Sequence, residues 1–345
     1  MTLTSKPADA EPTVVGGPGA TDVERAQKRG PGRDPDVVGL GRGRASLFVA
    51  PALVLVGVFL VFPALWTLYL GLLDYSLTGA SAQSPTLIGA QNYTDALSDP
   101  AFTKALYLTL LYVGFSAVIG QNILGFLLAW YFRTAPRAVR TTLNVLVLLA
   151  WILPGSVVAF LWQALLDRRD GILNTVLQTT GVAWTNDHPM AVIVIFNIWR
   201  GAAFSMLLYA AALNTVPTSH LEVARMAGAR PWQQLRDVVL PTVRRHVLTN
   251  TLLITLWTFN DFTPFLLTGG GPNHESETLP VYIYSTAILH GDLGYGSAIS
   301  LLLLLANLVI AVFYIRLLRG GDDGSLKAQQ RAERKARRAE RAVAT

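Results

Sequence analysis

The chain has 345 residues, of which 52% are apolar and only 14% are charged, and its mean hydropathy is +0.40. Soluble globular domains carry about a quarter charged residues, so this chain has too little charge to cover a water-facing surface, and its composition indicates a membrane protein. Cysteine is absent, which excludes disulfides, thiolate metal sites, a cysteine nucleophile and a cysteine-linked lipid anchor.

Six apolar segments are long enough to cross a bilayer core of about 30 Å, which takes about 20 helical residues. They cover about 46–73, 102–132, 139–166, 190–213, 247–267 and 298–318. The first segment is longer than the apolar region of a signal peptide and follows about 45 mostly polar residues, so we do not expect it to be cleaved. We predict an all-α polytopic membrane protein with six transmembrane helices.

The distribution of Lys and Arg predicts the orientation, because cytoplasmic loops retain positive charge. The two ends of the chain and the loops after the second and fourth segments hold 24 of these 28 residues, whereas the other three loops hold only Arg168 and Arg169. Both termini are therefore predicted to be cytoplasmic. Residues 1–45 and 320–345 are predicted to be basic, disordered tails. The C-terminal tail either contacts anionic lipid headgroups or is solvated and only enforces the topology.

No motif in the sequence points to an enzyme. There is no G-x-x-x-x-G-K-[ST] loop to hold nucleotide phosphates, and no two of the five histidines stand four residues apart. We therefore expect no catalytic residues, no metal site and no cofactor in this chain, and no nucleic-acid partner.

The connection between the fourth and fifth segments has about 30 residues, too many for a simple turn. It is predicted to form two short amphipathic helices. Ser219 and Glu222 fit a capping box at the start of the first, and Gly228 fits the left-handed residue that ends it. Pro231 suits the first turn of the second helix, and Pro241 is predicted to end it. Such a pair of helices either lies among the lipid headgroups or docks a soluble partner.

This connection also carries a family resemblance. It resembles the EAA loop of permease subunits in binding-protein-dependent carbohydrate ABC importers, of the maltose and glycerol-3-phosphate type. The matching residues are Glu222, Ala224, Gly228, Ala229, Leu240 and Pro241. Further matches follow in order over residues 45–319, at Gly89–Tyr93, Leu153–Pro154, Trp162, Gly171–Asn174, Trp199–Arg200, Ala211–Leu213, Val216–Pro217, Phe262, Leu267–Pro272, Thr278 and Tyr282–Tyr284. Two residues depart from the pattern: Val223 replaces the second motif Ala, and Ala227 replaces the Asp that usually precedes the Gly.

The resemblance implies a function and a set of partners. It implies that residues 46–319 form the permease domain of an importer in the bacterial inner membrane, which translocates an oligosaccharide or related polyol. It also implies a second permease subunit, two cytoplasmic ATPase subunits that use ATP, and an extracytoplasmic solute-binding protein. The six motif residues would couple the permease to the ATPase. The alternative is a secondary transporter driven by an ion gradient, which would favour inverted repeats that we do not find.

Arg200 and Asp261 are ionisable residues inside predicted transmembrane segments. Each costs about 2.5–3.5 kcal/mol at mid-bilayer, so each should face a partner or a water-filled path. They either form an ion pair that stabilises the bundle or line the path of the solute. Near Asp261, Trp257, Asn260 and Phe262 supply the aromatic faces and hydrogen-bonding groups that a sugar needs. Pro264 lacks an amide hydrogen, so it frees one backbone carbonyl that lipid cannot satisfy.

Overall fold

The computed structural model describes residues 42–179 and 181–343 and divides the chain into two units, 1–62 and 63–345. In the first unit, α2 (Arg42–Val56) continues into a π-helical turn, η1 (Gly57–Val61). Residues 42–45, predicted as tail, are therefore helical. The remainder of the predicted N-terminal tail, residues 1–41, lies outside the described residues.

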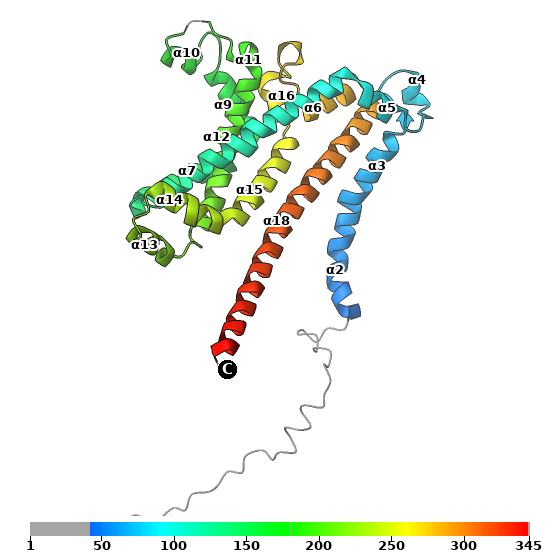
Figure 1. Cartoon of the computed structure of the whole chain (residues 1–345). Coiled ribbons are helices and arrows are strands. Elements are labelled where there is room, and N and C mark those ends of the chain that lie inside the picture. Colours follow the sequence, from blue (N-terminus) through cyan, green and yellow to red (C-terminus); the bar gives the residue numbers. More distant parts are fainter. Residues whose placement is uncertain (1–41, 180, 344–345) are drawn as a thin grey trace, which may run out of the picture. The chain divides into compact units, whose positions relative to one another are not determined.

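The second unit is helical apart from its loops and one small hairpin (Figure 1). Its strands, β1 (Leu73–Asp74) and β2 (Thr86–Leu87), pair antiparallel. Its helices up to the third apolar segment are α3 (Phe62–Leu70), α4 (Ala80–Gln83), α5 (Gln91–Ser98), α6 (Pro100–Tyr112), η2 (Val113–Gln121), α7 (Asn122–Phe132), α8 (Arg137–Ile152) and α9 (Gly155–Leu165). The later helices are α10 (Ile172–Val176), α11 (Trp184–Asp187), α12 (Pro189–Leu213), α13 (Thr218–Met226), α14 (Pro231–Gln234), η3 (Leu235–Val239), α15 (Leu240–Phe259), α16 (Thr263–Thr268), η4 (Pro272–His274), α17 (Leu279–Tyr284), η5 (Ser285–Leu289) and α18 (Leu293–Val343).

Four helical stretches within the described residues are long and apolar enough to cross a membrane unbroken. They are Ser46–Leu70, Pro100–Phe132, Pro189–Leu213 and Leu293–Leu318. These stretches correspond to the first, second, fourth and sixth predicted segments.

The third predicted segment is not one straight helix, because α8 and α9 meet at an angle of 99°. Leu153, between them, has an extended conformation with a ψ of 136°. The residue before a proline is disfavoured in the helical region, and Pro154 therefore ends α8. The fifth segment is also divided: α15 ends at Phe259, and α16 begins at Thr263 with Pro264 in its first turn.

The sixth segment continues well past its predicted end, because α18 runs without interruption to Val343. We predicted a break at Gly320–Gly324 and a disordered tail. The backbone is helical instead, in keeping with the Ala, Arg, Lys and Glu residues that follow, which all have high helix propensity.

Helix α12 lies at the centre of the second unit and packs against η2, α7, α8 and α15. Figure 1 shows α13 and α14 at one end of α12, and α10 and α11 at the other. One buried cluster, around Met206 and Tyr209, joins α7, α12 and α13 near the first of these ends. Another, around Tyr112 and Phe196, joins α6, α9, α12 and α16. These two clusters fix the helices that surround the cavity described next.

Candidate functional site

A cavity of about 280 Å³ lies among η2, α8, α12 and α15. It mixes charged, amide and aromatic side chains in an otherwise apolar bundle. Its lining residues are Gln121, Trp151, Asn197, Arg200, Gly201, Phe204, Ile254, Trp257, Thr258 and Asp261. Three of the five predicted path residues, Arg200, Trp257 and Asp261, therefore face one cavity.

Asp261 stands at the break between α15 and α16, and three hydrogen bonds hold its carboxylate. Tyr112 donates its hydroxyl to Oδ2 at 2.8 Å. Thr263 donates both its backbone amide, at 3.0 Å, and its hydroxyl, at 2.6 Å, to Oδ1. The carboxylate thus satisfies the first amide of α16 in the manner of an N-cap. Asp261 therefore stabilises the break between α15 and α16, which the continuous fifth segment of the prediction did not include.

Arg200 lines the same cavity but forms no ion pair with Asp261. No nitrogen of Arg200 comes within 4.0 Å of an acidic oxygen in the part of the chain that the structure describes. Its guanidinium instead lies against the backbone at the start of α9, where a Cβ on Gly155 would come 2.9 Å from Nη2. Of the two roles we considered, the geometry therefore does not support a direct ion pair.

Aromatic rings form one wall of the cavity. The ring centres of Phe204 and Trp257 are 4.8 Å apart, and those of Phe204 and Trp151 are 5.7 Å apart. Trp151 comes from α8, the helix that Pro154 ends. The sequence singled out Trp257 alone, because nothing in it shows that three different helices bring these rings together.

Polar side chains that line the cavity are hydrogen-bonded to one another and to their neighbours. Asn197 donates to the hydroxyls of Ser116, at 2.7 Å, and Thr258, at 3.2 Å. Gln121 donates to the backbone oxygen of Asn197 at 3.0 Å. A Cβ on Gly201 would come 2.1 Å from the Gln121 Cδ, so only glycine leaves room for this amide. The polar wall of the cavity is therefore fixed in place before any solute arrives.

Below this wall, Asn122 joins three helices at the end of the π-helical segment η2. Its Nδ2 donates to the backbone oxygens of Ala117 and Val118, which belong to this π-helical segment. Its Oδ1 accepts from Asn250, and also from the hydroxyl of Tyr209. Sequence reasoning missed this network, although the buried Asn250 lies in the segment that it found unusually polar.

The other two predicted path residues lie away from the cavity. Asn260 exchanges side-chain hydrogen bonds with Asn307 on α18, at 3.0 and 3.2 Å. Phe262 packs against Phe265 and Tyr284, with ring centres 5.0 Å away in each case. These contacts fasten the α15–α16 break to its neighbours.

The predicted coupling residues lie on α13 and at the junction that follows it. Gly228 has a φ of +79°, as the sequence predicted. Its amide donates to the oxygen of Arg225, and the amide of Ala229 donates to the oxygen of Ala224, both at 2.9 Å. This is a Schellman ending, which requires the left-handed residue that glycine supplies. Glu222 is exposed on the same helix.

Two details of this segment differ from the prediction. Helix α13 begins at Thr218 with Pro217 before it and no side-chain cap, so Ser219 lies inside the helix and forms no capping box. Pro241 does not end a helix, because α14, η3 and α15 follow one another without a gap. The π-helical turn accommodates the proline: the amide of Leu240 bonds to the oxygen of Leu235, five residues back.

The surface of α13 and α14 is unusually apolar. Met226 is 86% exposed, and Val223 and Trp232 are also largely exposed. Leu221, by contrast, is buried against the Met206–Tyr209 cluster. The segment is therefore anchored on one face and presents apolar side chains on the other. Leu240 and Pro241 are both exposed at its junction with α15.

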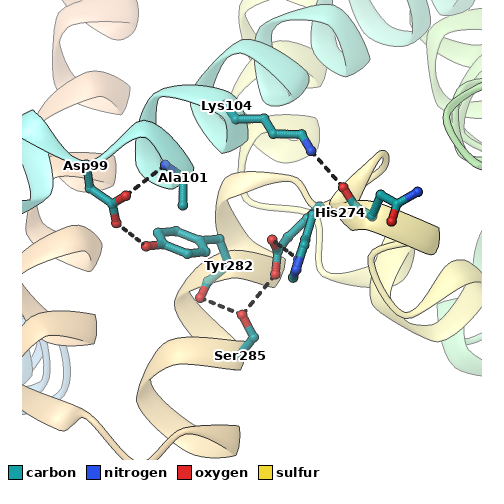
Figure 2. A network of polar contacts seen from close by, with 8 residues as sticks. Asp99, Ala101, Lys104, His274, Tyr282 and Ser285 are labelled. Carbon is teal, nitrogen blue, oxygen red and sulfur yellow. Dashed lines mark hydrogen bonds and ion pairs between the residues drawn. The ribbon is translucent and has the colours of Figure 1, made fainter.

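At the opposite end of the second unit, a polar network ties the start of α6 to α17 (Figure 2). Asp99 accepts hydrogen bonds from the hydroxyls of Tyr282, at 2.7 Å, and Tyr295, at 2.8 Å. Burial opposes its ionisation, but these bonds and one from the Ala101 amide outweigh it and hold the pKa of Asp99 below its usual value. Burial and the Asp99 carboxylate together raise the pKa of Tyr282 to about 12. Lys104 adds a bond to the backbone oxygen of Asn273 at 2.7 Å.

Comparisons with known proteins agree with this architecture. The chain is 28% identical over 284 residues to the sulfoquinovosyl glycerol transport system permease protein SmoG of Agrobacterium fabrum, covering 81% of this chain and 91% of that protein. It is 32% identical over 269 residues to the inner membrane ABC transporter permease protein YcjO of Escherichia coli, covering 75% and 88%.

The fold is that of a solved ABC importer. One similar structure is a bacterial alginate ABC transporter in complex with its alginate pentasaccharide-bound periplasmic protein; the TM-score is 0.67 at 19% identity, covering 78% of this chain and 92% of that one. Residues 121–320 match the family described as binding-protein-dependent transport system inner membrane component. These residues include α7 to α17, the cavity lining and the whole of the predicted coupling segment. The chain therefore belongs to this family and is an inner-membrane permease subunit of an ABC importer, not an enzyme.

Proposed function

We propose that this permease subunit translocates a sugar or a related polyol through the cavity that Arg200, Trp257 and Asp261 line. The observation that carries the proposal is the combination of an aromatic wall with a guanidinium and a carboxylate in one cavity of an apolar bundle. Sugar rings stack their apolar faces on aromatic side chains, and their hydroxyls need both donors and acceptors. Arg200 supplies donors only, and Asp261 supplies acceptors only. SmoG, named for a glycosyl glycerol, and the alginate transporter handle solutes of this class.

Within the site, the two charged residues have different roles. Asp261 is held by Tyr112 and Thr263, so its carboxylate offers a fixed acceptor. Arg200 makes no ion pair and is available to bind solute oxygens. Asn260 and Phe262, which lie outside the cavity, support the site by holding the α15–α16 break.

The orientation follows from the charge distribution. We propose six crossings with both termini in the cytoplasm, where the bent α8–α9 pair makes the third and the α15–α16 pair the fifth. The α13–α14 end of the unit then faces the cytoplasm, and the network around Asp99 faces the binding protein. Figure 1 is consistent with this arrangement, since these parts lie at opposite ends of the second unit.

The cytoplasmic end is proposed to dock an ATPase subunit. Its support is the exposed apolar surface of α13 with the fixed Schellman turn at Gly228. A complete importer would contain this chain, a second permease, two ATPases that use the ATP, and a solute-binding protein. Glu222, Ala224, Gly228, Ala229, Leu240 and Pro241 would transmit ATPase movements to α15. The rival, an ion-gradient transporter, is disfavoured because the chain belongs to an ABC importer family.

The test is uptake of labelled oligosaccharides and polyols by cells that lack the gene and carry it on a plasmid. Trp257→Ala should abolish uptake of the transported solute, whereas Trp257→Phe should retain part of it because a ring remains. Trp199→Ala is the matched control, since Trp199 is next to Arg200 but outside the cavity lining. Normal uptake by the Trp257→Ala variant would contradict the proposed path, and uptake of no sugar or polyol by the wild type would contradict the substrate class.

A further inference from the structure

A second cavity, of about 240 Å³, lies where α7 ends, between that helix and the α13–α14 segment. It is separate from the solute cavity and plays no part in the function proposed above. Its lining residues are Trp130, Tyr131, Arg133, Thr134, Arg225, Pro231 and Gln234. Two arginines face it, and no acidic residue lines it.

Both guanidiniums lack a counter-charge. Neither Arg133 nor Arg225 makes a side-chain hydrogen bond or an ion pair with any residue that the structure describes. The nearest carboxylates along the chain do not neutralise these charges. Glu222 makes no ion pair with either arginine, and Oδ1 of Asp237 lies 3.8 Å from Nε of Arg236 instead. Burial and the charge of Arg225 both lower the pKa of Arg133. Two like charges share a partly desolvated cavity, an arrangement that an anion would stabilise.

Aromatic contacts hold one of these arginines in position. The guanidinium carbon of Arg133 lies 4.2 Å from the ring centre of Trp130, a cation–π contact. Trp130 in turn stacks on Phe126. Arg133 is therefore oriented before any anion binds. Planar guanidinium groups with several N–H donors match the oxygens of phosphate and bind them by paired hydrogen bonds.

The position of the cavity favours a lipid as the source of the anion. Phe132 is the last residue of the apolar stretch that begins at Pro100, so Arg133 stands at the membrane–water boundary. Trp and Tyr are enriched at this level, and Tyr131 is 77% exposed. Ile123, Leu127 and Tyr131 follow one another at intervals of four residues on α7, and all three are exposed. They form an apolar stripe that runs from Tyr131 into the membrane. An acyl chain could lie along this stripe while its headgroup entered the cavity.

We propose that Arg133 and Arg225 bind the phosphate of an anionic phospholipid, such as phosphatidylglycerol, and so attach the coupling segment to the membrane surface. Basic cavities at helix ends beside the headgroup layer are suited to this ligand. A soluble partner would instead meet the exposed face of α13 that Val223 and Met226 form.

The test measures which lipids remain on the purified transporter that contains the full chain. Native mass spectrometry after exchange into mixed micelles of phosphatidylglycerol and phosphatidylcholine should show selective retention of phosphatidylglycerol. Arg133→Gln and Arg225→Gln should each lower this selectivity about fivefold. Arg137→Gln is the matched control, because it removes a charge from the nearby start of α8, outside the cavity lining, and should leave selectivity unchanged. Equal retention of both lipids by the wild type would overturn the proposal without relying on any variant.

Two further measurements distinguish a lipid from free phosphate and from an acidic surface of the ATPase partner. Inorganic phosphate has no acyl chain, so it should displace phosphatidylglycerol only in large excess; displacement at equal concentration would show a site for free phosphate and overturn the lipid assignment. Co-purification of the ATPase subunits is measured on the same samples. If the double variant keeps its phosphatidylglycerol but loses the ATPase subunits, the arginines bind an acidic surface of that partner and the lipid proposal fails.

Discussion

Tyr112 and Asp261 are 149 positions apart in the sequence, yet the tyrosine hydroxyl donates to the Asp261 carboxylate at 2.8 Å. This bond joins α6, in the second apolar segment, to the break that divides the fifth. It places a carboxylate at the edge of the solute cavity in one fixed orientation.

Tyr112→Phe removes this donor and leaves Asp261 with the two bonds from Thr263. A hydrogen bond to a charged group contributes about 2 kcal/mol, so the variant should assemble with lower thermal stability and reduced uptake. Thermal unfolding of the purified complex and uptake in cells would measure the two effects. Tyr107→Phe is the control, since Tyr107 is exposed on the same helix; equal effects of the two variants would contradict the role of the bond.

Arg200 and Asp261 should act on solute separately, because they form no ion pair. Arg200→Ala should reach the membrane in near-normal amounts and lose uptake. Asp261→Ala should also lose uptake, and it should be less abundant because it removes three hydrogen bonds at the α15–α16 break. The exchange of both residues, Arg200→Asp with Asp261→Arg, should not restore uptake. Membrane abundance and uptake are measured in the same strains. Low abundance of both single variants, with recovery in the exchange variant, would instead indicate a structural ion pair.

Gly201→Ala should disturb the cavity wall, because the added Cβ would come 2.1 Å from the Gln121 Cδ. Overpacking of this kind costs about 1–3 kcal/mol. Adding Gln121→Ala should recover most of the stability, although not the uptake, because the cavity loses its amide. Gly114→Ala, in the π-helical segment that contains Gln121, meets no atom within 4 Å and serves as the control. If the double variant does not recover stability, the destabilisation by Gly201→Ala does not come from overlap with Gln121.

Gly228→Val should uncouple ATP hydrolysis from transport. A Cβ on Gly228 meets no atom within 4 Å, so the cost is the backbone strain of a φ of +79°, about 1–2 kcal/mol. Solute-stimulated ATPase activity of the assembled complex should fall, and Glu222→Ala should lower it too. Gly79→Val also imposes backbone strain, at a φ of +86° in a distant loop, and should leave this activity unchanged. Wild-type uptake by both Glu222→Ala and Gly228→Val would contradict the coupling role.

Acid should loosen the attachment of α17 to α6. The pKa of Asp99 is lower in the folded protein than in the unfolded chain. Its contribution to stability is therefore complete above the unfolded pKa, about 3.9, and is lost as the pH falls through the folded value. Hydrogen exchange of α17 should accelerate below about pH 4. Asp99→Asn should show faster exchange already at neutral pH, whereas Asp95→Asn, exposed on α5, should behave as wild type.

The sequence determined those features that depend on one segment at a time. Hydropathy located four unbroken apolar helices, since crossing a bilayer needs a fixed length of apolar chain. Backbone restrictions located the left-handed turn at Gly228, because they act on the residue itself and its immediate neighbours. Leu153–Pro154 carries a local backbone restriction of the same kind. The bend there was missed because the hydropathy of the segment is continuous.

The tertiary structure alone decided which side chains meet. Arg200 and Asp261 line the same cavity, but Arg200 lies against Gly155 and Asp261 is hydrogen-bonded to Tyr112. Trp151, Phe204 and Trp257 come from three helices and form one wall only because α12 packs between α8 and α15. Helix rotation and packing depend on all the neighbouring side chains at once, so no single segment of the sequence encodes the contacts that make this cavity.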